Sequence, residues 1–299
     1  MRILHIVPGL DDPTCGIAVA AKMIAARQGE GAELVDSRRW TRAMVESADE
    51  VWVHSMWTPG VVLAAWCALR CGKRLVRMPH GCMDPVKLKR RWWKKALVAP
   101  LEKRLFRRAD SIVATDGSEE GWIRSFAGGG VRVSRVSLRP EGAFAVRAEG
   151  RAGERLRVLY VGRFAKLKGV RYLLQALPED ATLVMIGKDE GEEGVCRRIA
   201  AERKLDVEFR GVVGEEEKCA AYDWCDVLVL PTLSENFGLV VAEALERGKR
   251  VITTDGAPAW SGGERGVVYL EGYKDGRDEE RVEMLRGALA RMVEERRRE

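Results

Sequence analysis

The chain has 299 residues, of which 46% are hydrophobic and 32% charged, a globular composition long enough for two domains. Seven cysteines without CxxC spacing and only three histidines argue against a disulfide framework and a transition-metal cage. No apolar run reaches the roughly 20 residues of a membrane span. The short apolar run at residues 3–7 ends in Pro-Gly, which indicates a buried strand rather than a signal peptide, so we expect a cytoplasmic protein.

Short runs rich in Val, Ile and Leu alternate with helical stretches along the whole chain. Several of these runs are continuously apolar, as strands covered on both faces are. Such alternation predicts parallel sheets with crossover helices, and therefore two α/β domains in tandem. The expected strands are residues 3–7, 50–54, 75–78, 111–114, 157–162, 182–187, 207–211, 227–230 and 250–254.

The seam between the two domains is expected in residues 139–156, which combine Pro, Gly and mixed charges with little periodicity. We assign a first domain to residues 1–145 and a second to residues 146–277. Residues 278–299 are expected to form a final helix that could pack back toward the first domain.

Two loops in the second half carry the chemistry of an anion site. The first, GRFAKLKG at residues 162–169, places Arg163 and Lys168 between glycines after a strand, where they could close on a diphosphate. A solvated basic turn is the alternative interpretation. The second loop, residues 231–238, opens a helix whose first N–H groups attract anions.

Two glutamates flank that helix start with seven residues between them. Glu235 could accept hydrogen bonds from sugar hydroxyls. Glu243 lies in the apolar run 239–245, where a carboxylate is costly unless it is bound. It could accept from two ribose hydroxyls or pair with an arginine. Together the loops favour a sugar nucleotide, and the absence of a P-loop and of GxGxxG after a strand argues against a common kinase and a nicotinamide enzyme.

The first half offers two histidines at strand ends and a basic run. His54 follows the second expected strand and His80 the third, whereas His5 is expected in the core. Residues 87–108 hold ten Lys or Arg against one acid, Glu102, with Trp92 beside Trp93. This pattern predicts an interfacial helix on anionic lipid, interrupted at Pro100. A site for an acidic glycan or lipid-linked phosphate and a solvated surface remain open, and no nucleic-acid motif accompanies the charge.

Taken together, these motifs resemble glycosyltransferase family 4. ENFGLVVAE resembles its E-x7-E motif, VGRFAKLKG its GR…KG diphosphate clamp, VHSMW its HxxW turn, and PHGCMDP the PHGMLDP type of bacterial polysaccharide and lipopolysaccharide enzymes. The loop at residues 8–17 resembles its glycine loop, with only Gly16 carried over. The resemblance implies a GT-B fold, in which two Rossmann-like domains face each other across a cleft, and a retaining, metal-independent hexosyl transfer.

The resemblance also implies roles. The catalytic set would be Glu235, His80, Arg163 and Lys168. The donor-binding set would be Gly16, Asn236, Phe237, Gly238, Leu239 and Glu243. The acceptor or membrane side would be His54, Trp57, Lys89, Arg90, Arg91, Trp92, Trp93 and Lys94. We expect no metal site and no cofactor, because the nucleotide sugar, of UDP or GDP, is a substrate.

The expected partners are a nucleotide-sugar donor, a glycan or lipid-linked acceptor and the inner face of the cytoplasmic membrane, with no nucleic acid. Two alternatives stay open. A sugar-nucleotide epimerase of the same architecture would need no acceptor. A non-catalytic nucleotide-sugar-binding subunit would fit the short chain and the Pro-Glu-Gly at residues 140–142, where the family usually has Pro-Asn-Gly.

Overall fold

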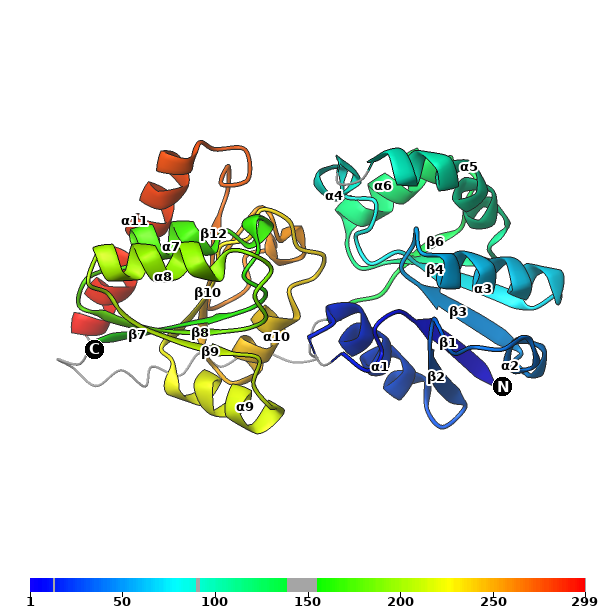
Figure 1. The fold of residues 1–299 in the computed structure, drawn as a ribbon, viewed down its shortest axis with the longest axis horizontal. Helices are drawn as coiled ribbons and strands as arrows, with labels where there is room; N and C mark the ends of the chain where they lie inside the picture. The colour runs from blue at the N-terminus through cyan, green and yellow to red at the C-terminus, as the bar shows by residue number, and fades with distance from the viewer. Residues whose placement is uncertain (13, 90–91, 139–154, 299) are drawn as a thin grey trace. The chain divides into compact units, whose positions relative to one another are not determined.

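The computed structural model describes residues 1–12, 14–89, 92–138 and 155–298. The chain divides into two compact units, Met1–Leu138 and Arg139–Glu299. Each unit is a six-stranded parallel sheet flanked by helices (Figure 1). Most of the expected seam, residues 139–156, lies outside the described residues, so the exact domain boundary stays a prediction.

The first unit orders its strands β2-β1-β3-β4-β5-β6. Apolar strand residues such as Leu4, Val51 and Leu75 are buried in one cluster with the inner face of α3. The strands are β1 (Ile3–Val7), β2 (Ala32–Asp36), β3 (Glu50–His54), β4 (Arg74–Met78), β5 (Ser111–Ala114) and β6 (Val133–Arg135), and the helices are α1 (Gly16–Gln28), α2 (Arg42–Ser47), α3 (Pro59–Arg70), α4 (Pro85–Lys89), α5 (Trp92–Arg108) and α6 (Gly117–Ala127).

The second unit orders its strands β12-β11-β10-β7-β8-β9. Numbered from its own first strand, this is the doubly wound order 3-2-1-4-5-6 of dinucleotide-binding domains. The strands are β7 (Leu156–Val161), β8 (Ala181–Ile186), β9 (Asp206–Gly211), β10 (Val227–Leu230), β11 (Arg250–Thr254) and β12 (Val267–Leu270), and the helical segments are η1 (Lys166–Lys168), α7 (Val170–Ala176), α8 (Glu193–Glu202), α9 (Glu215–Trp224), α10 (Leu239–Glu246), η2 (Pro258–Trp260) and α11 (Asp278–Arg298).

The strand orders locate one topological switch point in each sheet. In the first unit the chain reverses direction across the sheet between β1 and β3, and in the second between β7 and β10. Ligands of open α/β sheets bind outside the carboxyl ends of the strands at such points. The loops singled out from the sequence follow β3 and β4 in the first unit and β7 and β10 in the second.

Helix α5 runs without a break through Pro100, so the expected interruption at this residue is wrong. A proline costs the helix one hydrogen bond, here to the carbonyl of Ala96. Both residues are exposed, so water can solvate that carbonyl. None of the helices in the described part of the chain is long and apolar enough to cross a bilayer.

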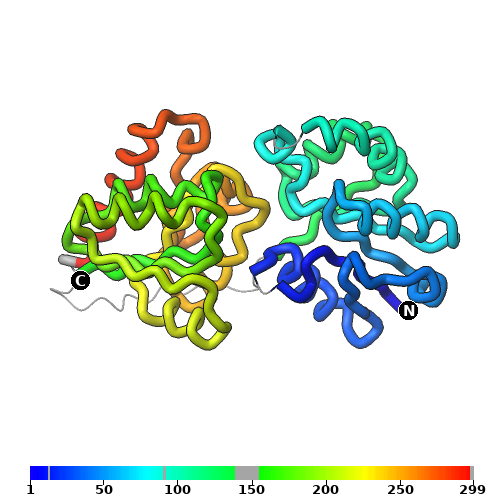
Figure 2. Tube along the Cα trace, in the orientation of Figure 1, coloured from blue at the N-terminus to red at the C-terminus, as the bar shows by residue number. Residues whose placement is uncertain are grey.

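The final helix α11 buries its apolar stripe in the core of the second unit. Leu285, Ala288, Leu289 and Met292 belong to the same buried cluster as the strands β7 and β8. Figure 2 shows α11, in red, running beside α7, and the two helices are in contact. The apolar stripe predicted from the sequence therefore packs within the unit that precedes it.

Candidate functional site

The two loops predicted to form an anion site touch each other at the switch point of the second unit. The backbone N–H of Leu233 donates to the carbonyl oxygen of Leu167 at 2.8 Å, and the Thr232 hydroxyl donates to the same oxygen at 3.2 Å. The loop after β7 and the loop after β10 are thus joined by hydrogen bonds although they are more than 60 residues apart in sequence.

Lys168 and Glu235 form an ion pair between these loops. Lys168 is buried, and the Glu235 side chain keeps 22% of its surface exposed. Glu235 Oε1 also accepts the backbone N–H of Asn236 at 3.0 Å. An ammonium has three N–H donors, so the pair with Glu235 alone does not use the full hydrogen-bonding capacity of Lys168.

Arg163 lies on the first loop with its guanidinium at the surface. It pairs with Glu190 at 2.8 Å, and about half of its side chain is exposed. Its carbonyl oxygen accepts the Tyr160 hydroxyl at 2.8 Å. Burial, helped by the charge of Glu235, raises the pKa of Tyr160 far above its usual range, so this hydroxyl stays a donor. The backbone of Arg163 is fixed while its side chain can exchange Glu190 for another anion.

Glycines allow the loops to interlock. Gly169 has φ +64°, and a Cβ there would lie 2.0 Å from the carbonyl oxygen of Pro231. Gly256, in the loop after β11, would place a Cβ 2.1 Å from the carbonyl oxygen of Thr232. The Gly256 carbonyl accepts the N–H of Glu235 at 2.7 Å. Three loops thus fix the backbone that presents the glutamate.

The first N–H groups of α10 have no acceptor within the helix. Gly238, at φ +74°, is its N-cap, and no side chain caps the helix. The preceding Phe237 is buried, and its carbonyl accepts the indole N–H of Trp260 at 2.5 Å. Asn236, Gly238 and Leu239 therefore lie on the turn that opens the helix, whereas the Phe237 ring packs against Trp260 and supports that turn.

Glu243 has its own protein partners. The Tyr222 hydroxyl donates to Oε2 at 2.7 Å, and Lys218 Nζ donates to Oε1 at 3.2 Å. Burial opposes the charge of Lys218, but Glu243 and Glu215 outweigh it and raise its pKa. These protein partners are a lysine and a tyrosine from α9, not the arginine considered as the alternative to ribose, and the carboxylate stays partly exposed. Neither Tyr222 nor Lys218 was assigned a role from the sequence.

In the first unit, three histidines form a line across the switch point. His5 lies on β1, His54 ends β3, and His80 follows β4 with φ +54°. His5 Nδ1 is 2.9 Å from His54 Nε2, and His54 Nδ1 is 2.8 Å from His80 Nε2. At the other end, His5 Nε2 is 2.6 Å from Oε1 of Gln28. The line joins the His54 and His80 of the predicted site to a core histidine and a glutamine that the sequence did not single out.

All three imidazoles are neutral at physiological pH. Burial lowers the pKa of His5 to about 4, against the hydrogen bond to Gln28. Burial lowers the pKa of His80 to about 3, and the positive charge of Lys87 contributes. The pKa of His54 lies well below its usual value because of burial and of its two histidine neighbours.

A buried carboxylate holds the turn at His80. Glu119 accepts the N–H of Gly81 at 2.5 Å and the N–H and hydroxyl of Thr115 at 2.8 and 2.7 Å. Burial raises the pKa of Glu119 in spite of these hydrogen bonds. The position of His80 is therefore set by the turns after β4 and β5 and by a side chain of α6.

Glu102, the one acid of the basic run, is fully buried. It pairs with the equally buried Arg77 at 3.0 Å and accepts the N–H of Trp57 at 3.0 Å. Trp57 has φ +70°, and its indole N–H donates to the carbonyl of Cys82 at 3.3 Å. Trp57 thus joins the loop after β3 to the loop after β4. The lone acid of a basic run is a sequence feature that could have pointed to this pair.

Helix α5 exposes apolar side chains among its cations. Trp92 and Trp93 are 67% and 54% exposed, and Leu97 is 76% exposed. Lys94 Nζ lies 5.1 Å from the centre of the Trp93 ring. Arg90 and Arg91 lie outside the described residues, and Lys89 is exposed. Gly16, exposed at the start of α1, has no atom near its Cβ position.

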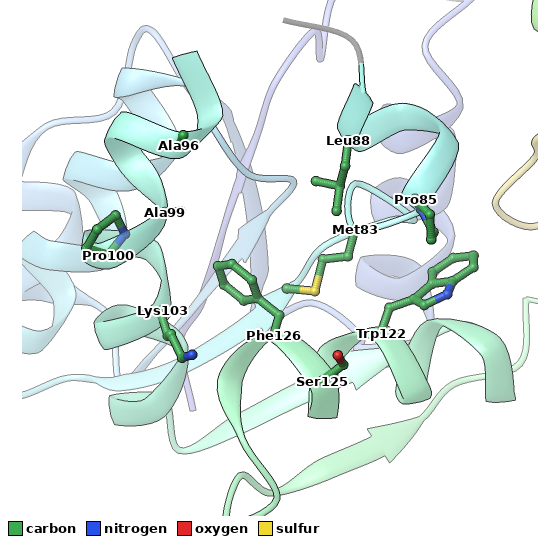
Figure 3. Close-up of a pocket in the computed structure, with 10 residues that line it drawn as sticks. All are labelled: Met83, Pro85, Leu88, Ala96, Ala99, Pro100, Lys103, Trp122, Ser125 and Phe126. Carbon is green, nitrogen blue, oxygen red and sulfur yellow. The ribbon is translucent and has the colours of Figure 1, made fainter. Parts of the chain in front are cut away.

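An apolar pocket of about 710 Å³ lies beside this helix. Figure 3 shows that its lining comes from the loop before α4 and from α4, α5 and α6. Ser125 and Lys103 are its polar members. The lining residues are Met83, Pro85, Leu88, Ala96, Ala99, Pro100, Lys103, Trp122, Ser125 and Phe126. Within the described residues, no histidine, cysteine and carboxylate side chains group to hold a metal ion.

Solved structures define the class of fold. Anabaena HepE in complex with UDP and glucose superposes with a TM-score of 0.73 over 97% of this chain and 90% of that one, at 15% identity. WaaG, described as a glycosyltransferase involved in lipopolysaccharide biosynthesis, superposes with a TM-score of 0.70 over 99% of this chain and 94% of that one, at 16% identity. Two Rossmann-like units of this kind constitute the GT-B architecture, as expected from the sequence.

Sequence comparison then identifies the family. The model for Glycosyltransferase Family 4 matches residues 8–164, and the model for Glycosyl transferases group 1 matches residues 144–261. This chain belongs to glycosyltransferase family 4. The phosphatidyl-myo-inositol mannosyltransferase of Mycobacterium tuberculosis is 32% identical over 123 residues, 38% of this chain and 32% of that protein. The chain spans about a quarter to a third of the curated relatives that it matches first.

Proposed function

We propose that this protein transfers a sugar, with retention of anomeric configuration, from a UDP- or GDP-sugar to a glycan or lipid-linked acceptor in cell-surface polysaccharide or lipopolysaccharide synthesis. The observation that carries the proposal is the Lys168–Glu235 pair at the switch point, beside the uncapped start of α10. A buried cation and open N–H groups suit a diphosphate, and a carboxylate beside them suits sugar hydroxyls. Family membership and the mannosyltransferase activity named for a relative support the same activity.

In this proposal the protein stabilises the leaving group. Lys168, Arg163 and the first N–H groups of α10 would neutralise the charge that grows on the departing diphosphate, with no metal assigned to that role. The acceptor hydroxyl would form the new bond to the anomeric carbon on the face that the nucleotide leaves, and the departing phosphate would take the hydroxyl proton. Glu235 is held by Lys168 and by the N–H of Asn236, which suits a positioning acceptor rather than a nucleophile.

Glu243 is assigned to the ribose of the donor. Its carboxylate is partly exposed and held by Tyr222 and Lys218, so it can accept further hydrogen bonds without turning. The proposal of UDP draws on HepE, which was crystallised with UDP and with UDP-glucose. Replacing Glu243 by Gln should weaken nucleotide-sugar affinity about tenfold, the effect of one charged hydrogen bond, with little change in turnover.

The transfer reaction tests this function directly. Labelled UDP- and GDP-sugars are incubated with glycan and lipid-linked acceptors, using wild type, Lys168→Ala and the matched control Lys166→Ala, whose side chain is exposed on the same turn. We expect Lys168→Ala to lose about 100-fold or more in turnover, the scale of one removed charge-stabilising donor, and Lys166→Ala to stay near wild type. Full transfer by Lys168→Ala would refute the assigned role.

The same experiment separates the alternatives. Conversion of the donor sugar without any acceptor would identify an epimerase. Tight nucleotide binding without turnover on any acceptor would identify a non-catalytic subunit. The anomeric configuration of the product, read by NMR coupling constants, checks retention, and an inverted product would exclude it.

The exposed face of α5 supports peripheral contact with the inner face of the cytoplasmic membrane. Trp92, Trp93 and Leu97 are exposed among lysines and beside the apolar pocket. Exposed rings with nearby cations bind interfaces that carry anionic lipid. Sedimentation with vesicles containing phosphatidylglycerol should fall several-fold in a Trp92→Ala/Trp93→Ala variant and stay unchanged in Trp66→Ala, an equally exposed tryptophan on α3. Equal binding to neutral vesicles would contradict the electrostatic part.

A further inference from the structure

The three histidines form a chain of hydrogen bonds in which every donor points the same way. A neutral imidazole carries one N–H donor and one bare nitrogen acceptor. In the chain each histidine uses one ring nitrogen toward each neighbour, at 2.9 Å between His5 and His54 and at 2.8 Å between His54 and His80. If one ring donates in one direction, the next ring must donate in the same direction. The three tautomers are therefore coupled and cannot vary independently.

Gln28 sets the direction of the chain. Its amide oxygen Oε1 lies 2.6 Å from His5 Nε2, and a carbonyl oxygen only accepts. His5 must therefore carry its proton on Nε2 and present bare Nδ1 to His54. His54 then donates from Nε2 and presents bare Nδ1, to which His80 donates from Nε2.

We propose that Gln28, His5 and His54 are positioning residues that hold His80 in the Nε2–H tautomer, so that its Nδ1 is a hydrogen-bond acceptor for a substrate hydroxyl. In the described part of the chain, Nδ1 of His80 has no hydrogen-bond partner. The rings also stack in sequence, at centroid distances of 5.2 Å and 5.1 Å, which restricts their rotation. The tautomer follows from the chain alone, and its use on a sugar hydroxyl rests on the proposed function.

The surroundings of His80 support a fixed ring. Its turn is held by the buried Glu119 through Gly81, and its backbone has φ +54°. The residue is 4% exposed, and its Nε2 faces His54 rather than solvent. A histidine in solution exchanges between its two neutral tautomers, whereas the His80 ring can donate only from Nε2 to His54.

Histidine-selective ¹⁵N NMR of the ligand-free full chain tests the proposal without any transfer reaction. The chain contains only His5, His54 and His80, so three imidazole spin systems report the whole line. At about pH 8 the ring nitrogens of neutral histidine separate into protonated and bare types. We expect all three residues to show protonated Nε2 and bare Nδ1. A protonated Nδ1 on His80, or a mixture of its tautomers, would overturn the assignment.

Variants at the far end of the chain test the coupling. Gln28→Leu removes the acceptor and should convert His80, two histidines away, into a tautomer mixture, with turnover lowered about tenfold, as expected for losing one ordinary hydrogen bond. Gln28→Glu keeps an acceptor and should restore the wild-type tautomer and most of the turnover. Gln175→Leu, the same change at the other glutamine, is the matched control.

Each outcome decides between the two proposals. An unchanged His80 spectrum in Gln28→Leu would overturn the coupling, even if the enzyme assignment holds. A changed spectrum with no transfer activity in any variant would leave the tautomer proposal standing and remove the proposed function. If Gln28→Leu does not fold, the wild-type and Gln28→Glu spectra still decide the direction of the chain, because an acceptor at this end allows only Nε2–H on all three rings.

Discussion

Acid should destabilise the first unit through its buried histidines, beginning as the pH falls below about 6.5. The unfolded chain binds a proton at each histidine near pH 6.5, whereas folded His5 resists protonation until about pH 4. The unfolded state therefore binds more protons throughout this window. The stabilising contribution of a neutral buried histidine is complete above pH 6.5 and is lost progressively as the pH falls toward the folded pKa.

The structure gives the size of this effect. Each histidine that stays neutral in the folded state lowers the free energy of unfolding by about 1.4 kcal/mol for every pH unit below 6.5. For His5 the window between 6.5 and about 4 corresponds to about 3 kcal/mol. Three such residues together give a slope of up to about 4 kcal/mol per pH unit near pH 5, a substantial fraction of the roughly 5–15 kcal/mol stability of an ordinary domain.

Urea unfolding at several pH values, followed by tryptophan fluorescence, measures the slope. Seven of the nine tryptophans and all three histidines lie in residues 1–138, so the second unit is an internal control. The variant His5→Asn should lower the slope of the first unit by about one third, whatever its effect on stability at neutral pH. Equal slopes for wild type and variant, or a stability maximum near pH 5, would refute the reasoning.

Two further changes test the packing that supports the candidate sites. Arg77→Met leaves the buried Glu102 carboxylate without its cation and should lower the free energy of unfolding of the first unit, measured in urea, by about 3 to 5 kcal/mol. The double change Arg77→Met/Glu102→Leu should recover part of that loss. Equal stabilities of the single and double variants would contradict the stabilising role of the pair. Gly169→Ala forces a Cβ against the carbonyl of Pro231, so it should destabilise the second unit by about 3 kcal/mol. It should also weaken nucleotide binding, measured by calorimetry. The control Gly263→Ala, with a similar φ but open space around the Cβ, should destabilise the unit by about 1 kcal/mol.

The sequence alone predicted the interior of both sheets and missed three strands. The missed strands β2, β6 and β12 all lie at sheet edges. Edge strands are covered less. The strand β12 is apolar throughout but only its last residue is buried, whereas β2 and β6 interrupt their apolar residues with charged or polar ones. In β6, for example, Val133–Arg135, two of three residues are exposed. The pattern of apolar residues predicts a strand through its burial, so the prediction is weakest for strands that are only partly buried.

The sequence also located the loops of the candidate sites, because a glycine-bounded basic turn and a helix start after a strand are local features. It could not assign the partners of their side chains. The pairing of Lys168 with Glu235 spans 67 residues, and Glu243 meets Tyr222 and Lys218 through the packing of α9 on α10. Such contacts depend on the order of the strands in the sheet, which the periodicity of apolar residues does not predict.

The histidines show the same division most clearly. Each was visible in the sequence as a single residue at a strand or strand end, and His5 was expected as core. Only the parallel register of β1 beside β3 and of β3 beside β4 brings the three rings within hydrogen-bond distance. The sequence thus determined which groups stand at the carboxyl ends of the strands. The tertiary structure decided which of them touch, because contact follows from the order of strands across the sheet rather than along the chain.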